Sequence, residues 1–346
     1  MSMTPAGDMA NALFLRRQTA TLKSDLSRHS QELTTGKAAD PLRKLRGDTT
    51  VLASLERSRI ALDAYKMATT EAELHTAAQQ RVLERLRVDA MDTAGQLLNF
   101  GTAVPPQMVD TAGRLAKEAF TDAVNALNTQ VGGRHIFSGV ESDKPPLASA
   151  DDILAALRTA VEGATNAEDM AAAVVAWFDS DDPVAGFMAQ AYLPEITDAK
   201  GPVALSPGER ITMTMTAARP ELRDLLSGLA MAALVGLEAE GGQDKLLAGQ
   251  PGERAQLLAT ASIKLAGAPV GVTALAGELG DTEARIEAAK TRNANERTAL
   301  ELALNDLISV DSFDAATKLE ETRVRIESLV TLTARLQRMS LTEFLR

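Results

Sequence analysis

A helical pattern about fifty residues long, from Asp48 to Phe100, limits the folds that this chain can adopt. At 1.5 Å per residue such a helix would extend about 75 Å. Its apolar residues follow one seam, which comprises Val51, Leu55, Leu62, Tyr65, Ala72, Leu83, Leu86, Leu97 and Phe100. Because compact domains seldom accommodate a helix of this length, the pattern predicts an elongated rod of antiparallel helices.

Both ends of the chain carry a seven-residue repeat with alternating steps of three and four, which is typical of a coiled coil. The first repeat contains Ala12, Leu15, Thr19, Leu22, Leu26, His29 and Leu33. The last helix has Asp311 as its predicted N-cap, and its repeat contains Leu319, Thr322, Ile326, Leu329, Thr333, Leu336 and Ser340. Polar residues interrupt both seams, so each seam alone can form only a weak hydrophobic core. We expect the two ends of the chain to meet.

The segment from Asn128 to Gly139 ends another helical pattern, which begins at Pro105-Pro106. Gly132 and Gly133 allow backbone angles that other residues resist. The alternation of apolar and polar residues around Phe137 then leads into a different composition. We predict that Gly132, Gly133 and Phe137 form a bend from the rod into an inserted module.

That module, residues 141–218, is acidic and rich in turns. Between Glu141 and Glu209 the sequence has thirteen acidic and three basic residues, whereas the whole chain has a net charge of −11. This charge argues against nucleic-acid binding, which requires a basic surface. Pairs such as Gly201-Pro202 indicate turns within the module. Short helices, the aromatic residues Trp177 and Phe178, and a strand at Ile211, Met213 and Met215 predict a small α+β insert with a core of its own.

The helical pattern resumes at residue 219 and is expected to kink at Pro269. The sequence therefore predicts a mainly α, elongated rod of antiparallel long helices in three parts. Residues 1–47 and 309–346 form terminal coiled-coil assembly segments. Residues 48–140 and 219–308 form the helical rod domain, and residues 141–218 form the variable insert.

Residues that could carry chemistry are scattered. The chain has no cysteine, and His29, His75 and His135 lie far apart without the spacing of a metal site. Neither a phosphate-binding glycine loop nor a nucleophile elbow occurs. We therefore expect no enzymatic activity, no cofactor and no metal.

Apolar runs are short. None approaches the roughly 18–20 residues that span a bilayer, so we expect no membrane insertion. Near the N-terminus, the four apolar residues 12–15 are too few for a signal peptide. If the protein leaves the cell, we expect a route that needs no cleaved signal.

Three stretches resemble the flagellin superfamily. Leu33-Thr34-Thr35-Gly36-Lys37 with Asp40-Pro41 resembles its N-terminal element, and residues 311–345 resemble its C-terminal helix. The stretch from Asn128 to Gly139 resembles the branch that forms the junction between flagellar hook and filament. The basic turn at residues 42–46 departs from the family's usual loop.

The resemblance implies a structural component of the extracellular flagellum, secreted unfolded through the type III apparatus. Its terminal helices would form an inner coiled coil that becomes ordered only on assembly. The implied partners are further copies of the chain in a ring, the other hook–filament junction protein, flagellin and an export chaperone.

Under this hypothesis the assembly interface comprises the apolar members of the terminal repeats: Leu15, Leu22, Leu26, Leu33, Leu319, Ile326, Leu329 and Leu336. The same residues could instead form an ordinary intramolecular core. Flagellin itself is the nearest alternative function. A soluble coiled-coil signalling protein fits less well, because the seams do not resemble a signalling hairpin. An enzyme would have to lie within the insert.

Overall fold

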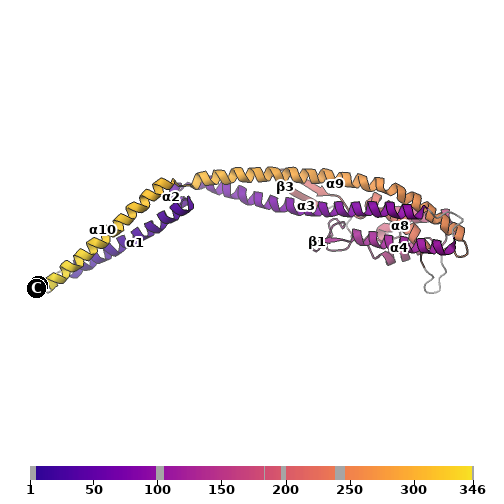
Figure 1. The fold of residues 1–346 in the computed structure, drawn as a ribbon, viewed down its shortest axis with the longest axis horizontal. Helices are drawn as coiled ribbons and strands as arrows, with labels where there is room; N and C mark the ends of the chain where they lie inside the picture. Colours follow the sequence, from indigo (N-terminus) through magenta and orange to yellow (C-terminus); the bar gives the residue numbers. More distant parts are fainter. Residues whose placement is uncertain (1–4, 99–104, 183, 196–199, 238–245, 345–346) are drawn as a thin grey trace. The chain divides into compact units, whose positions relative to one another are not determined.

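The computed structural model describes residues 5–98, 105–182, 184–195, 200–237 and 246–344, with the backbone alone for 5–9, 11, 12, 200 and 336–344 (Figure 1). Helices account for 74% of the residues, which confirms the predicted mainly α fold. The sheets of the described part are two antiparallel pairs, β1–β2 and β3–β4.

The first half of the chain forms α1 (Pro5–Thr35), α2 (Pro41–Lys44), α3 (Thr50–Leu97), α4 (Pro106–Leu127), β1 (Gln130–Val131), β2 (Arg134–His135) and α5 (Ala150–Ala160). The second half forms α6 (Ala167–Asp179), α7 (Phe187–Gln190), β3 (Lys200–Ser206), β4 (Glu209–Met213), α8 (Pro220–Val235), α9 (Pro251–Ile308) and α10 (Ser312–Phe344).

The predicted helix starts are confirmed by local hydrogen bonds and by proline. The Asp48 carboxylate accepts from Thr50 N at 3.1 Å before α3. The Asp311 carboxylate accepts from Phe313 N at 2.8 Å before α10. Each carboxylate satisfies an amide that has no partner within the first helical turn. Pro106 occupies the first turn of α4, where its missing amide hydrogen costs nothing.

The chain forms two compact units, and their boundaries fall within α3 and α9. The first unit comprises residues 1–63 and 294–346, and the second comprises residues 64–293. The three predicted segments, 1–47 with 309–346, 48–140 with 219–308, and 141–218, stay a prediction.

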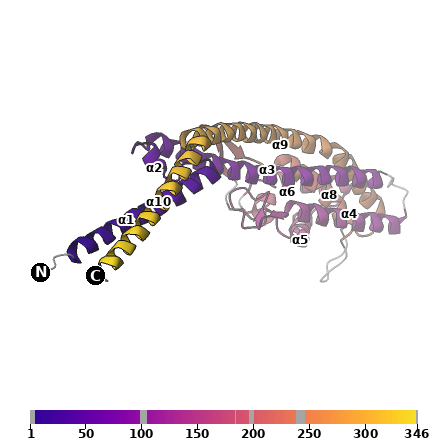
Figure 2. The same cartoon turned by 60° about the vertical axis from the view of Figure 1, so that its left-hand side comes forward.

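In the first unit, α1 and α10 pack along each other (Figure 2). The loops beside them are also joined. Ala38 N donates to Ile308 O at 2.8 Å, and Val310 N donates to Gly36 O at 2.9 Å. Gly36 adopts a positive φ of 67° at the end of α1, a conformation that favours glycine. The predicted meeting of the two chain ends is confirmed.

In the second unit, one hydrophobic core includes residues of α3, α4, α8 and α9 together with residues of α5, α6 and α7. Phe178 and Phe187, from residues 141–218, belong to this core, as does Phe120 of α4. The prediction of a separate core for the insert is therefore wrong. Its short helices bury their apolar faces against the long helices, because each face is too small to form a core alone.

A second, smaller cluster lies under the β3–β4 hairpin. Leu205, Ile211 and Met213 pack on Ala72 of α3 and on Ile286 of α9. The strand predicted at Ile211, Met213 and Met215 is confirmed as β4 for the first two residues, whereas Met215 lies beyond the end of β4. Its partner β3 was not predicted, because Gly201-Pro202 indicated a turn rather than a strand.

Helix α9 continues through Pro269 without interruption. Among the described residues, α9 is the one helix that is long and apolar enough to cross a membrane. Its 18-residue window has a mean hydropathy of 1.4, and 39% of that window is buried inside the protein. Core helices of soluble proteins meet the same criterion, so this observation is weak evidence for a membrane span. The sequence analysis had not identified this window.

Candidate assembly surface of the terminal helices

The predicted assembly residues lie along α1 and α10, where each helix covers only part of the other. Leu15, Leu22 and Leu26 are half-buried, and Leu33 is 37% exposed. On α10 the half-buried residues of the predicted set are Leu319, Ile326 and Leu329. The side chain of Leu336 lies outside the described residues. The pair of helices therefore leaves part of each of these side chains accessible to a further partner.

The buried positions of this helix pair are small or polar. Among the described side chains of α10, Ala315 and Thr322 are the buried ones, 1% and 6% exposed. The Thr322 hydroxyl donates to Lys318 O at 2.7 Å, one turn earlier in the same helix. Small and self-satisfied side chains let the helices approach, but they bury little apolar surface.

Large apolar side chains are exposed elsewhere on the same two helices. Leu13 and Phe14 of α1 are 56% and 58% exposed, and Val324, Val330 and Leu332 of α10 are 51–57% exposed. The sequence analysis missed these five residues because they lie outside the repeats that it followed. Their apolar character on otherwise polar helix faces was the available signal.

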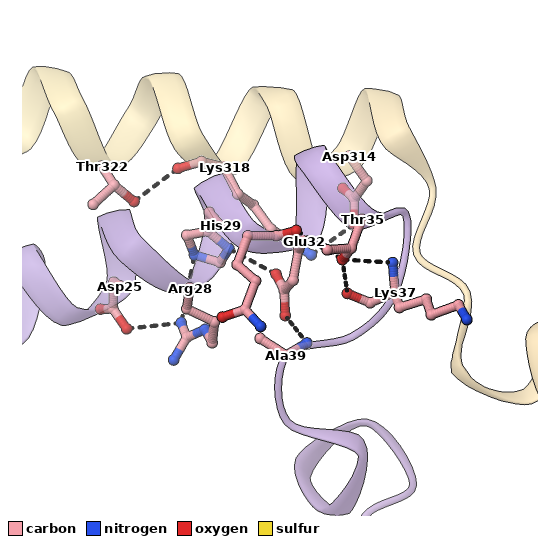
Figure 3. Close-up of polar contacts among 11 residues, drawn as sticks. Asp25, Arg28, His29, Glu32, Thr35, Lys37, Ala39, Asp314, Lys318 and Thr322 are labelled. Atoms are coloured by element: carbon pink, nitrogen blue, oxygen red, sulfur yellow. Dashed lines mark hydrogen bonds and ion pairs between the residues drawn. The ribbon is translucent and has the colours of Figure 1, made fainter.

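Charged side chains line a cleft of about 630 Å³ beside α1 and α10. Figure 3 shows the polar contacts of this region. Arg28 pairs with Asp25 at 2.7 Å, and His29 Nδ1 lies 3.0 Å from Glu32 Oε2. The other Glu32 oxygen accepts from Ala39 N at 3.3 Å. Glu32 therefore connects α1 to the loop that precedes α2.

Across the cleft, Lys318 pairs with Asp314 at 2.6 Å. A hydrogen bond to Asp314 raises the pKa of the Lys318 ammonium, and this group is solvent-exposed. Exposed ion pairs contribute little to stability, typically about 0–1 kcal/mol. The cleft thus presents both signs of charge, and its ion pairs each lie within one helix and contribute little to the stability of the fold.

The predicted bend residues lie in and beside the β1–β2 hairpin, which follows α4. Gly132 and Gly133 have positive φ angles of 60° and 78°, and strand pairing joins Val131 to Arg134. Phe137 is fully buried, and its carbonyl accepts from Ala217 N at 2.9 Å.

Two polar residues that hold this segment were not in the predicted set. The Gln79 amide of α3 donates to Ile136 O at 2.6 Å within the core. Asn128 donates to Leu147 O at 3.0 Å and accepts from Leu147 N at 2.9 Å. A glutamine on the apolar side of the α3 pattern was the signal for Gln79.

The described residues contain no group of three or more His, Asp or Glu side chains that could hold a metal. Burial raises the pKa of the Tyr192 phenol to about 12. Such a phenol stays protonated at neutral pH and is not poised for proton transfer.

A comparison with known protein families finds a match for the C-terminal part of the chain. Residues 264–345 match the bacterial flagellin C-terminal helical region, which here spans most of α9 and α10. No curated protein sequence matches the chain. A solved structure, the "putative flagellar hook-associated protein from Vibrio parahaemolyticus", is similar in fold, with a TM-score of 0.50 and 14% sequence identity.

That similarity covers 78% of this chain and 98% of the Vibrio chain. At 14% identity it concerns the fold alone, and it agrees with the long helices and small sheets described above. Residues 264–345 are therefore similar to a flagellin C-terminal helical region, and the mainly α fold of the described residues agrees with a flagellin-like protein.

Proposed function

We propose that this chain forms the junction between flagellar hook and filament and assembles through α1 and α10. One observation carries the proposal. Six leucine and isoleucine side chains of the two repeats are half-buried, and Leu33 is exposed, within a pair of helices that has no third layer among the described residues: Leu15, Leu22, Leu26, Leu319, Ile326 and Leu329. Such side chains gain burial only when another helix packs on the pair.

The energetic argument concerns association. Fully burying a leucine or isoleucine side chain is worth about 1.5–3 kcal/mol relative to exposure. In the isolated chain, α1 and α10 obtain only part of this, and Ala315 and Thr322 add little. Assembly with neighbouring copies in a ring would supply the rest. The helices would become ordered on assembly if the free energy gained by this burial outweighs the conformational entropy that they lose.

The hook-associated assignment has two supports besides the flagellin region. The segment from Asn128 to Gly139 resembles the junction branch of the superfamily. The similar Vibrio structure carries a hook-associated name. In this role the other junction protein would bind on the hook side and flagellin on the filament side.

We further propose that the chain is exported through the flagellar type III apparatus and resides in the extracellular flagellum. A cysteine-free sequence suits a chain that passes unfolded into oxidising surroundings. An export chaperone would bind it before export and cover the exposed apolar residues of α1 or α10.

The test of the junction role is microscopy of a strain that lacks the chain. Hooks without attached filaments are the expected result, and normal filaments would contradict the proposal. Complementation with Ile326→Asp is expected to fail, because a charge would enter the half-buried seam. Arg323→Asp, an exposed position on the same helix, serves as the matched control and should restore the filaments.

Flagellin is the second candidate, favoured by the match of residues 264–345. The two functions differ in self-assembly. A flagellin polymerises by itself into long filaments, which electron microscopy of the purified full-length chain would reveal. Short rings or monomers under the same conditions would favour the junction role.

A further inference from the structure

A row of exposed apolar side chains follows α3 within the second unit. Leu74, Met91 and Leu98 are 52%, 51% and 65% exposed, and Val88 is 39% exposed. With Arg81 they recur at steps of seven or three residues, and we call this row the α3 stripe: Leu74, Arg81, Val88, Met91 and Leu98. Spacings of seven and three are those of a coiled-coil seam. These side chains are therefore only partly covered within the described structure.

A second row follows the exposed side of α9 in the same unit. Its residues alternate steps of four and three, and we call it the α9 stripe: Ile263, Gly267, Val270, Ala274, Gly277, Asp281, Ala284 and Ala288. Ile263 and Val270 are 72% and 76% exposed. The stripe thus combines two large apolar side chains at one end with a shallow surface of alanine and glycine beyond them.

We propose that the α3 stripe of one molecule packs, antiparallel, against the α9 stripe of a second copy of this chain. The inference deepens the proposed self-assembly and rests on it only for the identity of the partner. It adds a lateral contact within the second unit, separate from α1 and α10.

Size and length match between the two stripes. From Leu74 to Leu98, and from Ile263 to Ala288, each row extends about 36 Å at 1.5 Å per residue. The α3 stripe carries large side chains, whereas most of the α9 stripe is alanine or glycine. Large side chains of one helix can therefore enter the shallow surface of the other, as knobs enter holes.

Charge complementarity selects the register. Each stripe contains one charged residue, Arg81 on α3 and Asp281 on α9, and both are exposed. The described structure gives neither side chain an ion-pair partner within its own chain. Placing Arg81 opposite Asp281 brings Val88 opposite Ala274 and Leu74 opposite Ala288.

The remaining large residues then also meet. In the same antiparallel register Met91 lies beside Val270, and Leu98 lies beside Ile263. Apolar residues face apolar residues along the whole contact, and the one pair of charges is opposite in sign. A shift by one heptad would set Arg81 against Ala274 or Ala288 and leave both charges unpaired.

The register also agrees with the fold of a single chain. Gln80 donates to Ala276 O at 3.0 Å, and Lys290 pairs with Glu73 at 2.9 Å, so these parts of α3 and α9 lie at similar heights within one molecule. The proposed contact keeps this correspondence to within about two helical turns. Neighbouring copies would therefore lie side by side, with little axial displacement.

Because the two stripes are different surfaces, the contact is heterologous. After one such contact, the first copy keeps a free α9 stripe and the second keeps a free α3 stripe, so contacts of this kind generate a closed ring or an open array. In this arrangement a second copy covers the exposed apolar part of α9. The high hydropathy of this helix is then explained by a protein contact and not by a lipid contact.

Cysteine cross-linking of the full-length protein tests the register, because the chain has no native cysteine. Val88→Cys chains are mixed with Ala274→Cys chains at high concentration under mild oxidation. Disulfide formation requires Cα atoms within about 7 Å, so the mixed dimer should form in clear excess over either homodimer. The matched control replaces Ala274→Cys with Ala288→Cys, which lies about 21 Å further along the same exposed face.

Equal yields from the two pairs, a predominant Val88→Cys homodimer, or no cross-link above random collision would overturn the proposal. Charge reversal gives a second measurement. Arg81→Glu or Asp281→Arg alone should lower the yield of the Val88–Ala274 pair about fivefold, the effect of roughly 1 kcal/mol for one ion pair. The double reversal should restore it, and failure to do so would reject the assigned register.

This outcome is separable from the junction role. If a strain without the chain keeps normal filaments while the cross-link forms in register, the lateral contact stands and the proposed function falls. If the filaments detach but the cross-link fails, the junction role stands and the lateral contact falls.

Discussion

Gly113 of α4 and Gly236 at the end of α8 contact each other through their backbones. A Cβ atom at Gly113 would lie 2.4 Å from Gly236 N, and one at Gly236 would lie 2.2 Å from the Gly113 carbonyl carbon. A side-chain rotation could not relieve such a clash, because the opposing atoms belong to the main chain. The two helices can approach this closely only with glycine at both positions.

Gly113→Ala is therefore expected to destabilise the second unit by at least about 1–3 kcal/mol, the cost of overpacking a core contact. Chemical denaturation followed by circular dichroism measures this change. Gly280→Ala is the matched control, since nothing lies within 4 Å of a Cβ at that position of α9. The control should be neutral or slightly stabilising, and equal destabilisation by both variants would contradict the argument.

Gln79→Met is expected to lower the free energy of unfolding by about 1–3 kcal/mol, because the Ile136 carbonyl would lose its buried hydrogen-bond donor. Methionine has a similar length, so a cavity contributes little. Thermal and denaturant unfolding measure the loss. Gln96→Met, at an exposed position of the same helix, should leave stability nearly unchanged, and a similar loss in the control would remove the support for this role.

Helices α1 and α10 of the monomer are expected to exchange their amide hydrogens much faster than α8. Residues of α8 are almost all buried in the core, whereas α1 has no buried residue among its described side chains. Local opening of the terminal pair therefore exposes little apolar surface and costs little free energy. Hydrogen-exchange mass spectrometry provides the measurement, and protection of α1 and α10 equal to that of α8 would contradict the expectation.

The cap of α3 predicts a pH dependence. Hydrogen bonds to the backbone and side chain of Thr50 lower the pKa of the Asp48 carboxyl from its ordinary value of 3.8. A lowered pKa in the folded chain means that ionised Asp48 stabilises α3 above pH 3.8, and that this contribution is lost as the pH falls through the folded pKa.

Asp48→Asn should therefore reduce the difference in unfolding free energy between pH 6 and pH 2.5 compared with the original chain. Denaturant unfolding at the two pH values provides the comparison. Glu56→Gln, at an exposed position further along α3, is the control for the general loss of a carboxylate. An equal reduction in both variants would show that the cap is not responsible.

Several parts of the fold follow from local sequence. The start of α3 at Thr50, the cap at Asp311 and the strand at Ile211 were all predicted, because capping groups and side-chain periodicity act over a few residues. The half-buried condition of Leu22 and Ile326 agrees with seams that polar residues interrupt. Their role in assembly remains a proposal, since a single chain does not contain the partner.

Other features depend on residues far apart in the chain. Trp177 and Phe178 suggested an independent core, but they pack into the same core as the long helices. Gly201-Pro202 indicated a turn, yet β3 pairs there with β4. In both cases contacts across the fold outweigh the local preference, as is common for strands and short helices.

By itself, the sequence determined the class of the fold and the positions of most helices, because helix periodicity and caps are local. The tertiary structure decided that residues 141–218 share the main core, that Gln79 holds the segment after the hairpin, and that Gly113 meets Gly236. It also left the α3 and α9 stripes exposed. These outcomes depend on which helix faces find partners in space, and periodicity cannot distinguish a buried face from an exposed one.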